Sequence, residues 1–205
     1  MKINYENMML EMLKKVSPEK KSLLLHSCCA PCSSAVIEFL TNYFDVTIFF
    51  YNPNITDTEE YRKRRDEHLE YIRKNNLNLK FLEGNYAPKE EFFLPVKGLE
   101  TVPEGGERCT ICYNLRMEKT AQTAKEMGFH YFTTVLSISP LKNSQKINLI
   151  GEELEKKYGV TYLYGDFKKK GRYLRSIELS REHHLYRQDF CGCIFSKVER
   201  EAMKK

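Results

Sequence analysis

The chain has 205 residues, 41% of them hydrophobic and 30% charged, which is enough to bury the core of one ordinary domain without a disulfide scaffold. Residues 1–25 are rich in lysine and contain no apolar run long enough for a signal peptide or a membrane span, so we expect a cytoplasmic protein with no membrane partner. The net charge of +5 mildly favours binding to polyanionic partners.

The first predicted element is a helix. Apolar residues recur at helical spacing over residues 3–17, and the dipeptide Ser17-Pro18 is expected to end this helix. We interpret residues 1–20 as an N-terminal amphipathic extension and residues 21–205 as a single catalytic domain.

Short strands and longer helices alternate over the rest of the chain. In chain order the pattern predicts a strand at 22–26, a helix at 33–43, a strand at 46–51, a helix at 57–75, a strand at 79–82, a helix near 88–94, a helix at 113–127, a strand at 130–136, a helix at 145–158 and a strand at 161–164. This alternation is typical of an α/β fold in which helices cover both faces of a parallel sheet. Ligands bind such sheets at the carboxyl ends of the strands, and Cys28 directly follows the first predicted strand.

The cysteines are the most informative residues. All seven fall into three tight groups, namely Cys28-Cys29-Ala30-Pro31-Cys32, Cys109-Thr110-Ile111-Cys112 and Cys191-Gly192-Cys193. In a reducing compartment cysteines rarely form structural disulfides, and an odd number of cysteines cannot all be paired. Metal binding or redox catalysis is therefore favoured. Groups this far apart meet only if the fold brings their loops together, and a thiolate cluster of this size most often holds a metal.

The first two groups are read as metal ligands. Cys109 and Cys112 form a C-x-x-C pair entering a helix, whose N-terminus is expected to lower the thiol pKa. The adjacent Cys28 and Cys29 are not expected to reach one small ion together, whereas two irons of one cube can accept them, so the spacing favours a [4Fe-4S] cluster over zinc. Cys32 is either a ligand of an adjacent iron or a packed residue.

The third group has a different chemistry. Cys191 and Cys193, separated by a flexible glycine, can close a strained and easily reduced disulfide, or they can complete a metal site. Asp189 precedes them and can hold a metal or deliver a proton, although a surface carboxylate paired with Arg187 is the plainer interpretation.

Most of the net charge lies in residues 166–187, which contain seven basic and three acidic side chains. Tyrosine and histidine are interleaved with the basic residues and can stack on bases, so nucleic acid is favoured over a merely solvated face. The candidate nucleic-acid contacts are Lys168, Lys169, Lys170, Arg172, Arg175, Tyr186 and Arg187.

Six ordered motifs point to a known family. They are Leu24-Leu25-His26-Ser27-Cys28-Cys29-Ala30-Pro31-Cys32-Ser33, Tyr51-Asn52-Pro53-Asn54-Ile55, Cys109-x-x-Cys112-Tyr113-x-x-Arg116, Thr133-Thr134 with Ser139-Pro140, Asp166-Phe167, and Tyr186-Arg187-Gln188-x-Phe190-Cys191-Gly192-Cys193-x-Phe195-Ser196. Together they resemble the QueH-type epoxyqueuosine reductases from about residue 22 to residue 196.

The resemblance implies a reaction and roles for the cysteines. Epoxyqueuosine at the wobble position of tRNA would lose its epoxide oxygen by reduction, the final step of queuosine synthesis, without cobalamin and with electrons from an unidentified donor. It implies Cys28, Cys29, Cys109 and Cys112 as ligands of a [4Fe-4S] cluster. An additional mononuclear iron with Cys32 as its ligand stays open. Cys191 and Cys193 would be the redox-active pair.

The implied fold is that of nucleotide-binding α/β proteins of the adenine nucleotide alpha hydrolase type, which include tRNA thiolases. Residues 27–34 occupy the place of their glycine-rich pyrophosphate loop with three cysteines and no glycine, which argues against ATP use. Two other functions stay open. One is an iron–sulfur tRNA sulfur transferase, and the other is a non-catalytic RNA-binding module stabilised by zinc.

Overall fold

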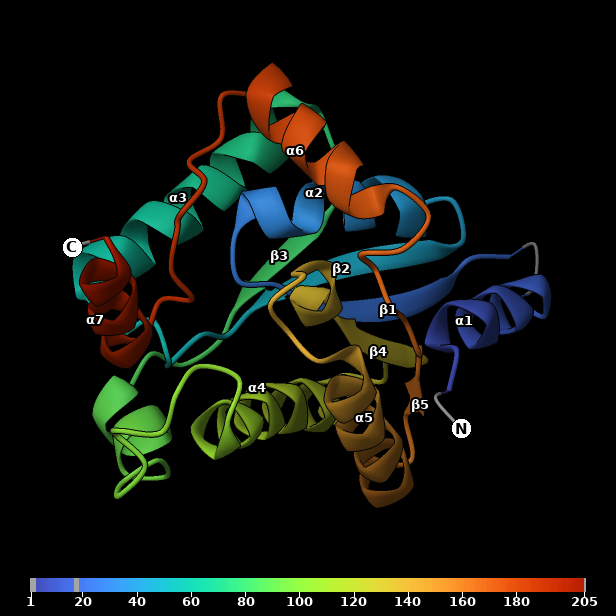
Figure 1. The fold of residues 1–205 in the computed structure, drawn as a ribbon. Coiled ribbons are helices and arrows are strands. Elements are labelled where there is room, and N and C mark those ends of the chain that lie inside the picture. Colours follow the sequence, from blue (N-terminus) through green and yellow to red (C-terminus); the bar gives the residue numbers. More distant parts are fainter. Residues whose placement is uncertain (1–2, 17–18, 205) are drawn as a thin grey trace.

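A computed structural model describes residues 3–16 and 19–204. The strands are β1 (Lys21–His26), β2 (Phe44–Phe50), β3 (Lys80–Glu83), β4 (Tyr131–Thr134) and β5 (Thr161–Tyr162). The helices are α1 (Tyr5–Lys14), α2 (Ala30–Leu40), α3 (Thr58–Lys74), α4 (Glu107–Glu126), α5 (Ser144–Tyr158), α6 (Arg172–Glu182) and α7 (Ile194–Met203), with a π-helix η1 (Lys89–Phe93) and a 3-10 helix η2 (Val135–Ile138). The strands are all parallel, in the order β3-β2-β1-β4-β5 (Figure 1).

Helices cover both faces of this sheet, as the sequence predicts. Figure 1 shows α2, α3 and α6 on one face and α4 and α5 on the other. Alternate side chains of a strand point to opposite faces, so Leu23 and Leu25 of β1 join the core under α2 while Leu24 joins the core over α4 and α5. The predicted α/β class is therefore confirmed.

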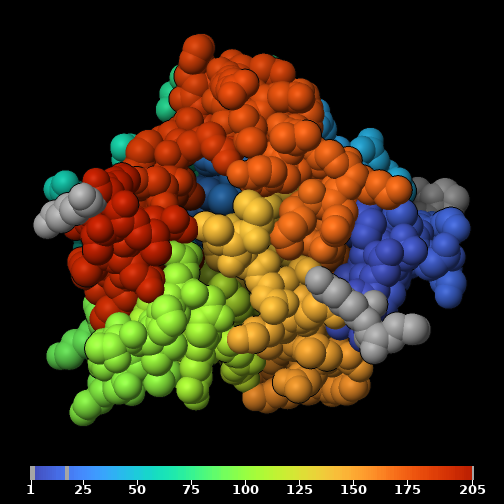
Figure 2. All heavy atoms as spheres, viewed as in Figure 1, coloured from blue at the N-terminus to red at the C-terminus, as the bar shows by residue number. Residues whose placement is uncertain are grey.

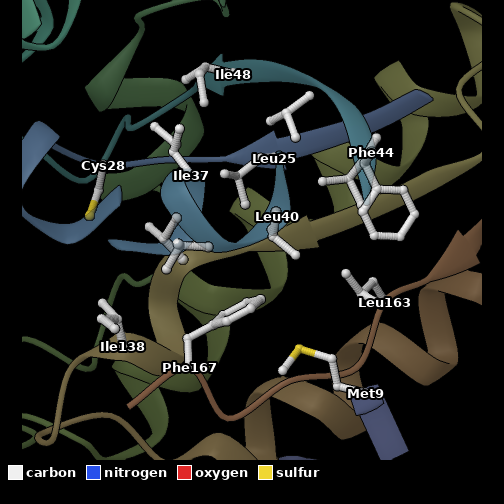
Figure 3. Close-up of a cluster of buried hydrophobic side chains, with 14 of the residues drawn as sticks. Met9, Leu25, Cys28, Ile37, Leu40, Phe44, Ile48, Ile138, Leu163 and Phe167 are labelled. Atoms are coloured by element: carbon white, nitrogen blue, oxygen red, sulfur yellow. The ribbon is translucent and has the colours of Figure 1, made fainter. Parts of the chain in front are cut away.

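The larger of the two cores runs directly into the first cysteine loop. Figure 3 shows Cys28 at one end of this cluster of buried side chains, with Leu25 and Ile37 beside it and Met9 of α1 at the opposite end. The cysteine loop is thus anchored on packed hydrophobic residues, and a packed base holds a site more rigidly than a surface loop does.

Two predicted elements need correction. α4 begins at Glu107 rather than near residue 113, so Cys109 and Cys112 lie inside its first turns and not on a preceding loop. The predicted strand at 130–136 is divided, because β4 ends at Thr134 and η2 follows. Two helices, α6 and α7, are additional to the predicted set. Over the described residues, no helix combines the length and the apolar character that crossing a bilayer requires.

The N-terminal helix α1 is docked on the rest of the protein. The rings of Tyr5 and Tyr164 stack with their centroids 5.8 Å apart, and Met9 is fully buried. Glu6 forms a buried ion pair with Arg172 at the start of α6. The dipeptide expected to end this helix, Ser17-Pro18, lies outside the described residues.

We predict that Arg172→Met lowers the free energy of unfolding by about 3–5 kcal/mol, because it leaves the Glu6 carboxylate buried without its partner. The double variant Glu6→Gln, Arg172→Met should recover much of this loss, since neither remaining side chain carries a buried charge. Urea unfolding of the three proteins measures the effect. Normal stability of Arg172→Met together with weakened RNA binding would contradict this assignment and restore Arg172 to the RNA surface.

Candidate functional site

The three cysteine groups converge at the carboxyl edge of the sheet. Cys28 follows β1, the Tyr51-Asn52-Pro53-Asn54 turn follows β2, and residues 135–143 follow β4. A cavity of about 180 Å³ opens here, lined by side chains that include Cys28, Cys32 and Cys191. Figure 2 shows the hollow at the centre of this face, bordered by the orange and red C-terminal segments and by the yellow segment near residue 140.

The first cysteine group is compact. The Sγ atoms of Cys28, Cys29 and Cys32 all lie within 4.8 Å of one another, and the Cys28 and Cys29 sulfurs are 3.9 Å apart. The expectation that adjacent Cys28 and Cys29 cannot reach one small ion is therefore wrong. Cys29 is the N-cap of α2, so the chain passes here from the loop into the helix and Cys32 lies in the first turn of α2.

Buried polar residues hold this loop in place. Asn52 donates an N–H to the Ser27 carbonyl at 2.9 Å, and the His68 ring nitrogen Nε2 lies 3.0 Å from the Ser33 hydroxyl. His26 is bonded at both ring nitrogens, to the Thr134 hydroxyl and to the Tyr51 carbonyl, which makes it a satisfied core residue. These bonds tie Ser27 and the two elements that flank the cysteine loop, β1 and α2, to the turn after β2, to β4 and to α3, so the fold sets the shape of the loop.

The second and third groups share a small enclosed cavity. Its lining includes Cys109, Cys112, Cys191 and Cys193, and also Asn54. Cys191 lines both this cavity and the larger open one, so it stands where the two meet. The structure thus brings all three cysteine groups to one region, as the sequence predicts.

The Cys191-Gly192-Cys193 segment is clamped by α3 and α7. The buried Arg64 donates to the carbonyl of Cys191 at 3.1 Å, and the Ser196 hydroxyl accepts from the Cys191 N–H at 3.1 Å. Gly192 has a φ of 122°, and a Cβ at this position would lie 2.9 Å from Cγ1 of Ile55. Only glycine fits both requirements, because other residues rarely adopt this φ and have no space for the added carbon.

Two cations lie among the thiols. Arg116 is buried and donates to Asn52 Oδ1 at 3.4 Å, and the half-buried Lys142 lines the open cavity with it. Burial by itself lowers the pKa of each group, but nearby cysteines outweigh it. Cys112, Cys191 and Cys28 raise the pKa of Arg116, and Cys191 and Cys28 raise that of Lys142. Both side chains are therefore cations at neutral pH, and they favour negative charge on the sulfurs.

Burial keeps most of the thiols protonated. It raises the pKa of Cys112 to about 11 and that of Cys193 to about 12, and it also raises the pKa of Cys109. The expected lowering by the helix N-terminus is therefore wrong for the C-x-x-C pair, because desolvation is the larger effect. Cys28 differs, since hydrogen bonds from Cys29 and then Cys32 hold its pKa well below the usual range.

Asp189 lines the open cavity but is not paired with Arg187. It forms an ion pair with Lys204, which lowers the pKa of the Asp189 carboxyl, so this group is ionised at neutral pH. Arg187 instead donates to the Ser180 hydroxyl at 3.1 Å and lines the same cavity.

Some of the residues predicted to contact nucleic acid are buried or paired with carboxylates, and others are exposed. Arg172 is buried, and Arg175 is paired with three carboxylates, those of Glu38, Glu178 and Glu182. Lys168 pairs with Asp166 at 2.8 Å, whereas Lys169 and Lys170 are exposed.

Tyr186 presents one ring face to a cation, because Lys63 Nζ lies 3.3 Å from its ring centroid. Its hydroxyl donates to Glu60, the carboxylate that also pairs with Arg64. Tyr186 thus sits beside the clamp on the Cys191 segment.

Sequence reasoning missed several residues of this site, above all Arg116, Lys142 and Glu104. Glu104 accepts from the Ser196 hydroxyl at 3.1 Å and lines both cavities, yet its Gly/Pro-rich surroundings carry no signal in the sequence. Arg116 and Asn52 can be found in the sequence, because each belongs to one of the motifs that resemble the family.

We predict that the stability of the protein falls as the pH drops from about 6.5 toward 4, partly through His68. Burial lowers the pKa of His68 to about 4, whereas an unfolded histidine titrates near 6.5. The unfolded state therefore binds the extra proton first, and stability that is complete above pH 6.5 is lost by about 1.4 kcal/mol per pH unit for this group. Urea unfolding across this range should show a shallower pH dependence in His68→Gln, and equal slopes would contradict the prediction.

The fold and the site together define an α/β protein with a buried multi-cysteine centre at the carboxyl edge of its sheet. Comparison with known proteins agrees with this class. A family model for epoxyqueuosine reductase QueH matches residues 23–199. The chain belongs to this family.

Several curated relatives carry the same name. The epoxyqueuosine reductase QueH of Streptococcus pyogenes serotype M1 is 44% identical over 95% of this chain and 78% of its own length. The one from Thermotoga maritima is 39% identical over 87% of this chain and 92% of its own length. Among solved structures, the U34-tRNA thiolase NcsA from Methanococcus maripaludis with its [4Fe-4S] cluster aligns with a TM-score of 0.40 at 10% identity, covering 86% of this chain and 75% of that one.

Proposed function

We propose that this protein is an oxidoreductase that converts epoxyqueuosine to queuosine at the wobble position of tRNA, the final step of queuosine biosynthesis, in the cytoplasm. Family membership over residues 23–199 supports the reaction. The observation that carries the proposal is the position of Cys191, which joins an open cavity to a buried set of thiols.

The reaction needs two electrons and two protons, and it releases the epoxide oxygen as water. One pair of thiols supplies one turnover, because a Cys191–Cys193 dithiol that closes to a disulfide gives up two electrons and two protons. We assign the substrate-facing role to Cys191, which lines the open cavity, and the second thiol to the buried Cys193. A separate electron donor, not identified by the sequence, then reduces the disulfide for the next turnover.

We further propose an iron–sulfur group held by Cys28, Cys29, Cys109 and Cys112, with no role for cobalamin or ATP. The donor set fits, since soft thiolates select iron–sulfur clusters or zinc. Arg116 and Lys142 would offset the negative charge of the thiolates. When bound, the group would pass single electrons to and from the dithiol. Cys32 converges with Cys28 and Cys29 and would hold a mononuclear iron beside the cluster.

Metal analysis of protein purified without oxygen tests this assignment. Iron and acid-labile sulfide at about four each per chain support the cluster, and additional iron supports the site at Cys32. The convergence of three sulfurs within 4.8 Å also fits a single tetrahedral ion, which keeps a zinc-stabilised RNA-binding module as the second candidate. Stoichiometric zinc without sulfide would favour that candidate and exclude the cluster.

Residues around the open cavity would receive the modified base. The Lys142 cation lines this cavity and would hydrogen-bond the epoxide oxygen and stabilise negative charge that develops on it. Asp189 lines the same cavity and is our candidate for moving a proton to that oxygen. Because its carboxylate is ionised at neutral pH, it would first take up one of the two protons that the dithiol releases.

The surface that we propose for tRNA is narrower than the basic segment. Lys169 and Lys170 are exposed, Lys168 precedes them in the chain, Arg187 lines the cavity, and Tyr186 precedes Arg187. Arg172 is not part of this surface, because it is buried. Arg175 is already paired with carboxylates and would contribute little to tRNA binding. Replacing Lys169 and Lys170 by alanine should weaken tRNA binding and reduce its salt dependence, as loss of phosphate contacts does.

Complementation tests the activity itself. In a bacterial strain that accumulates epoxyqueuosine in its tRNA because it lacks its own reductase, expression of this protein should restore queuosine. An empty vector is the control. Persistent epoxyqueuosine, despite soluble protein that contains iron and sulfide, would overturn the proposed reaction.

A further inference from the structure

Two asparagines of the turn after β2 are buried alike but bonded differently. Asn52 donates to the Ser27 carbonyl at 2.9 Å and accepts from Arg116 at 3.4 Å. Asn54 is 1% exposed, yet neither Nδ2 nor Oδ1 has a hydrogen-bond partner among the described residues. An unpaired buried polar group costs about 1–3 kcal/mol, so Asn54 calls for a partner outside the polypeptide.

The surroundings of Asn54 identify that partner. Asn54 lines the small cavity whose other lining residues include Cys109, Cys112, Cys191 and Cys193. A bound group in a cavity with this many thiols is one that thiolates hold, which is an iron–sulfur group or a metal ion. The four cysteine sulfurs, and the sulfurs of a group that they hold, are acceptors that the unpaired Asn54 amide N–H would find in this cavity.

The turn that carries Asn54 is fixed against the cysteine segment. Thr56 donates its backbone N–H to the Gly192 carbonyl at 3.2 Å, and the Thr56 hydroxyl accepts from the Ile194 N–H at 3.0 Å. Gly192 packs so closely on Ile55 that no Cβ fits between them. The backbone that follows Asn54 is therefore held against the redox-active segment.

We propose that Asn54 is a positioning residue that donates its amide N–H to a sulfur of the iron–sulfur group held in this region and thereby raises the reduction potential of that group. The inference rests on the proposed function, because it requires the iron–sulfur group. Reduction adds negative charge to the sulfurs, and an N–H dipole pointing at them stabilises the reduced state more than the oxidised state.

Asn54→Leu tests the proposal in the complete chain with its iron–sulfur group, since leucine has a similar size and no donor. The midpoint potential, followed by electron paramagnetic resonance during a redox titration, should become more negative while iron and sulfide content stay normal. At a fixed potential the ratio of reduced to oxidised protein should fall about tenfold, which corresponds to 59 mV for a one-electron couple. An unchanged potential with a normal cluster would overturn the proposal.

Two further comparisons make the test decisive. Asn52→Leu should lower thermal stability, because it removes the partners of Ser27 and Arg116, whereas Asn54→Leu removes no hydrogen bond within the chain. If Asn54→Leu does not retain the cluster, Asn54→Ser and Asn54→Ala are compared instead. Serine keeps a hydrogen-bond donor and alanine has none, so the midpoint potential of Asn54→Ser should be the higher of the two. Equal potentials in that pair would also overturn the inference. A wild-type protein without iron and sulfide would instead refute the proposed function.

Discussion

Replacing Cys191 by serine is expected to lower epoxyqueuosine reduction by about three orders of magnitude or more, because a hydroxyl cannot form the disulfide that supplies two electrons. Cys191 lines both the open cavity and the thiol cavity, and no other cysteine does so. Turnover on tRNA carrying epoxyqueuosine, measured with a chemical reductant and without oxygen, gives the effect.

The companion measurements separate redox chemistry from metal binding. Iron content and tRNA affinity of Cys191→Ser should match the wild type, because Cys191 belongs neither to the proposed ligand set nor to the proposed basic contacts with tRNA. Cys28→Ser should lose iron, since its sulfur belongs to the compact triad. Turnover that survives in Cys191→Ser would show that this thiol is not the electron source.

Gly192→Ala is expected to lower turnover by about 100-fold, because a displacement of about 1 Å at reacting groups has that effect. The added Cβ would lie 2.9 Å from Ile55 Cγ1 and 3.3 Å from Arg64 Nη1, at a φ of 122° that alanine rarely adopts. The segment must therefore shift, and Cys191 and Cys193 move with it. Steady-state turnover, with circular dichroism to confirm folding, measures the effect.

Gly98 supplies a matched control for backbone strain. Its φ is 86°, but a Cβ there would meet nothing within 4 Å. Gly98→Ala should cost a little stability and leave turnover near the wild-type value. If the two alanine variants behave alike, the close packing around Gly192 does not govern the position of the dithiol.

Local signals in the sequence were sufficient for most of the fold. The apolar run before Cys28 predicts β1, and Asp57 caps α3 through bonds to the N–H groups of Glu59 and Glu60. α6 was missed because its buried face carries Arg172, Ser176 and Ser180 beside Leu179, and this polar pattern hides the helical period. Only tertiary partners such as Glu6 make that face stable when buried.

The part of the site that could be predicted is the part whose reactive residues lie close together in the sequence. Three groups of cysteines imply a shared centre, and the structure places them together. The place of Lys142 in the site was not predictable, because a lone lysine in a sequence is normally a surface residue. The state of the thiols also depends on the fold, since desolvation outweighs the helix N-terminus at Cys112.

The measurement that tests the central claim most directly is the conversion of epoxyqueuosine in tRNA by the purified protein under anaerobic conditions with a chemical reductant. Nucleosides from the digested tRNA are separated and identified by mass spectrometry, with heat-treated protein as the control. The account predicts queuosine, lighter by one oxygen atom than the substrate and formed in many turnovers per chain. Unchanged epoxyqueuosine, with protein that binds the tRNA and contains iron and sulfide, would contradict it.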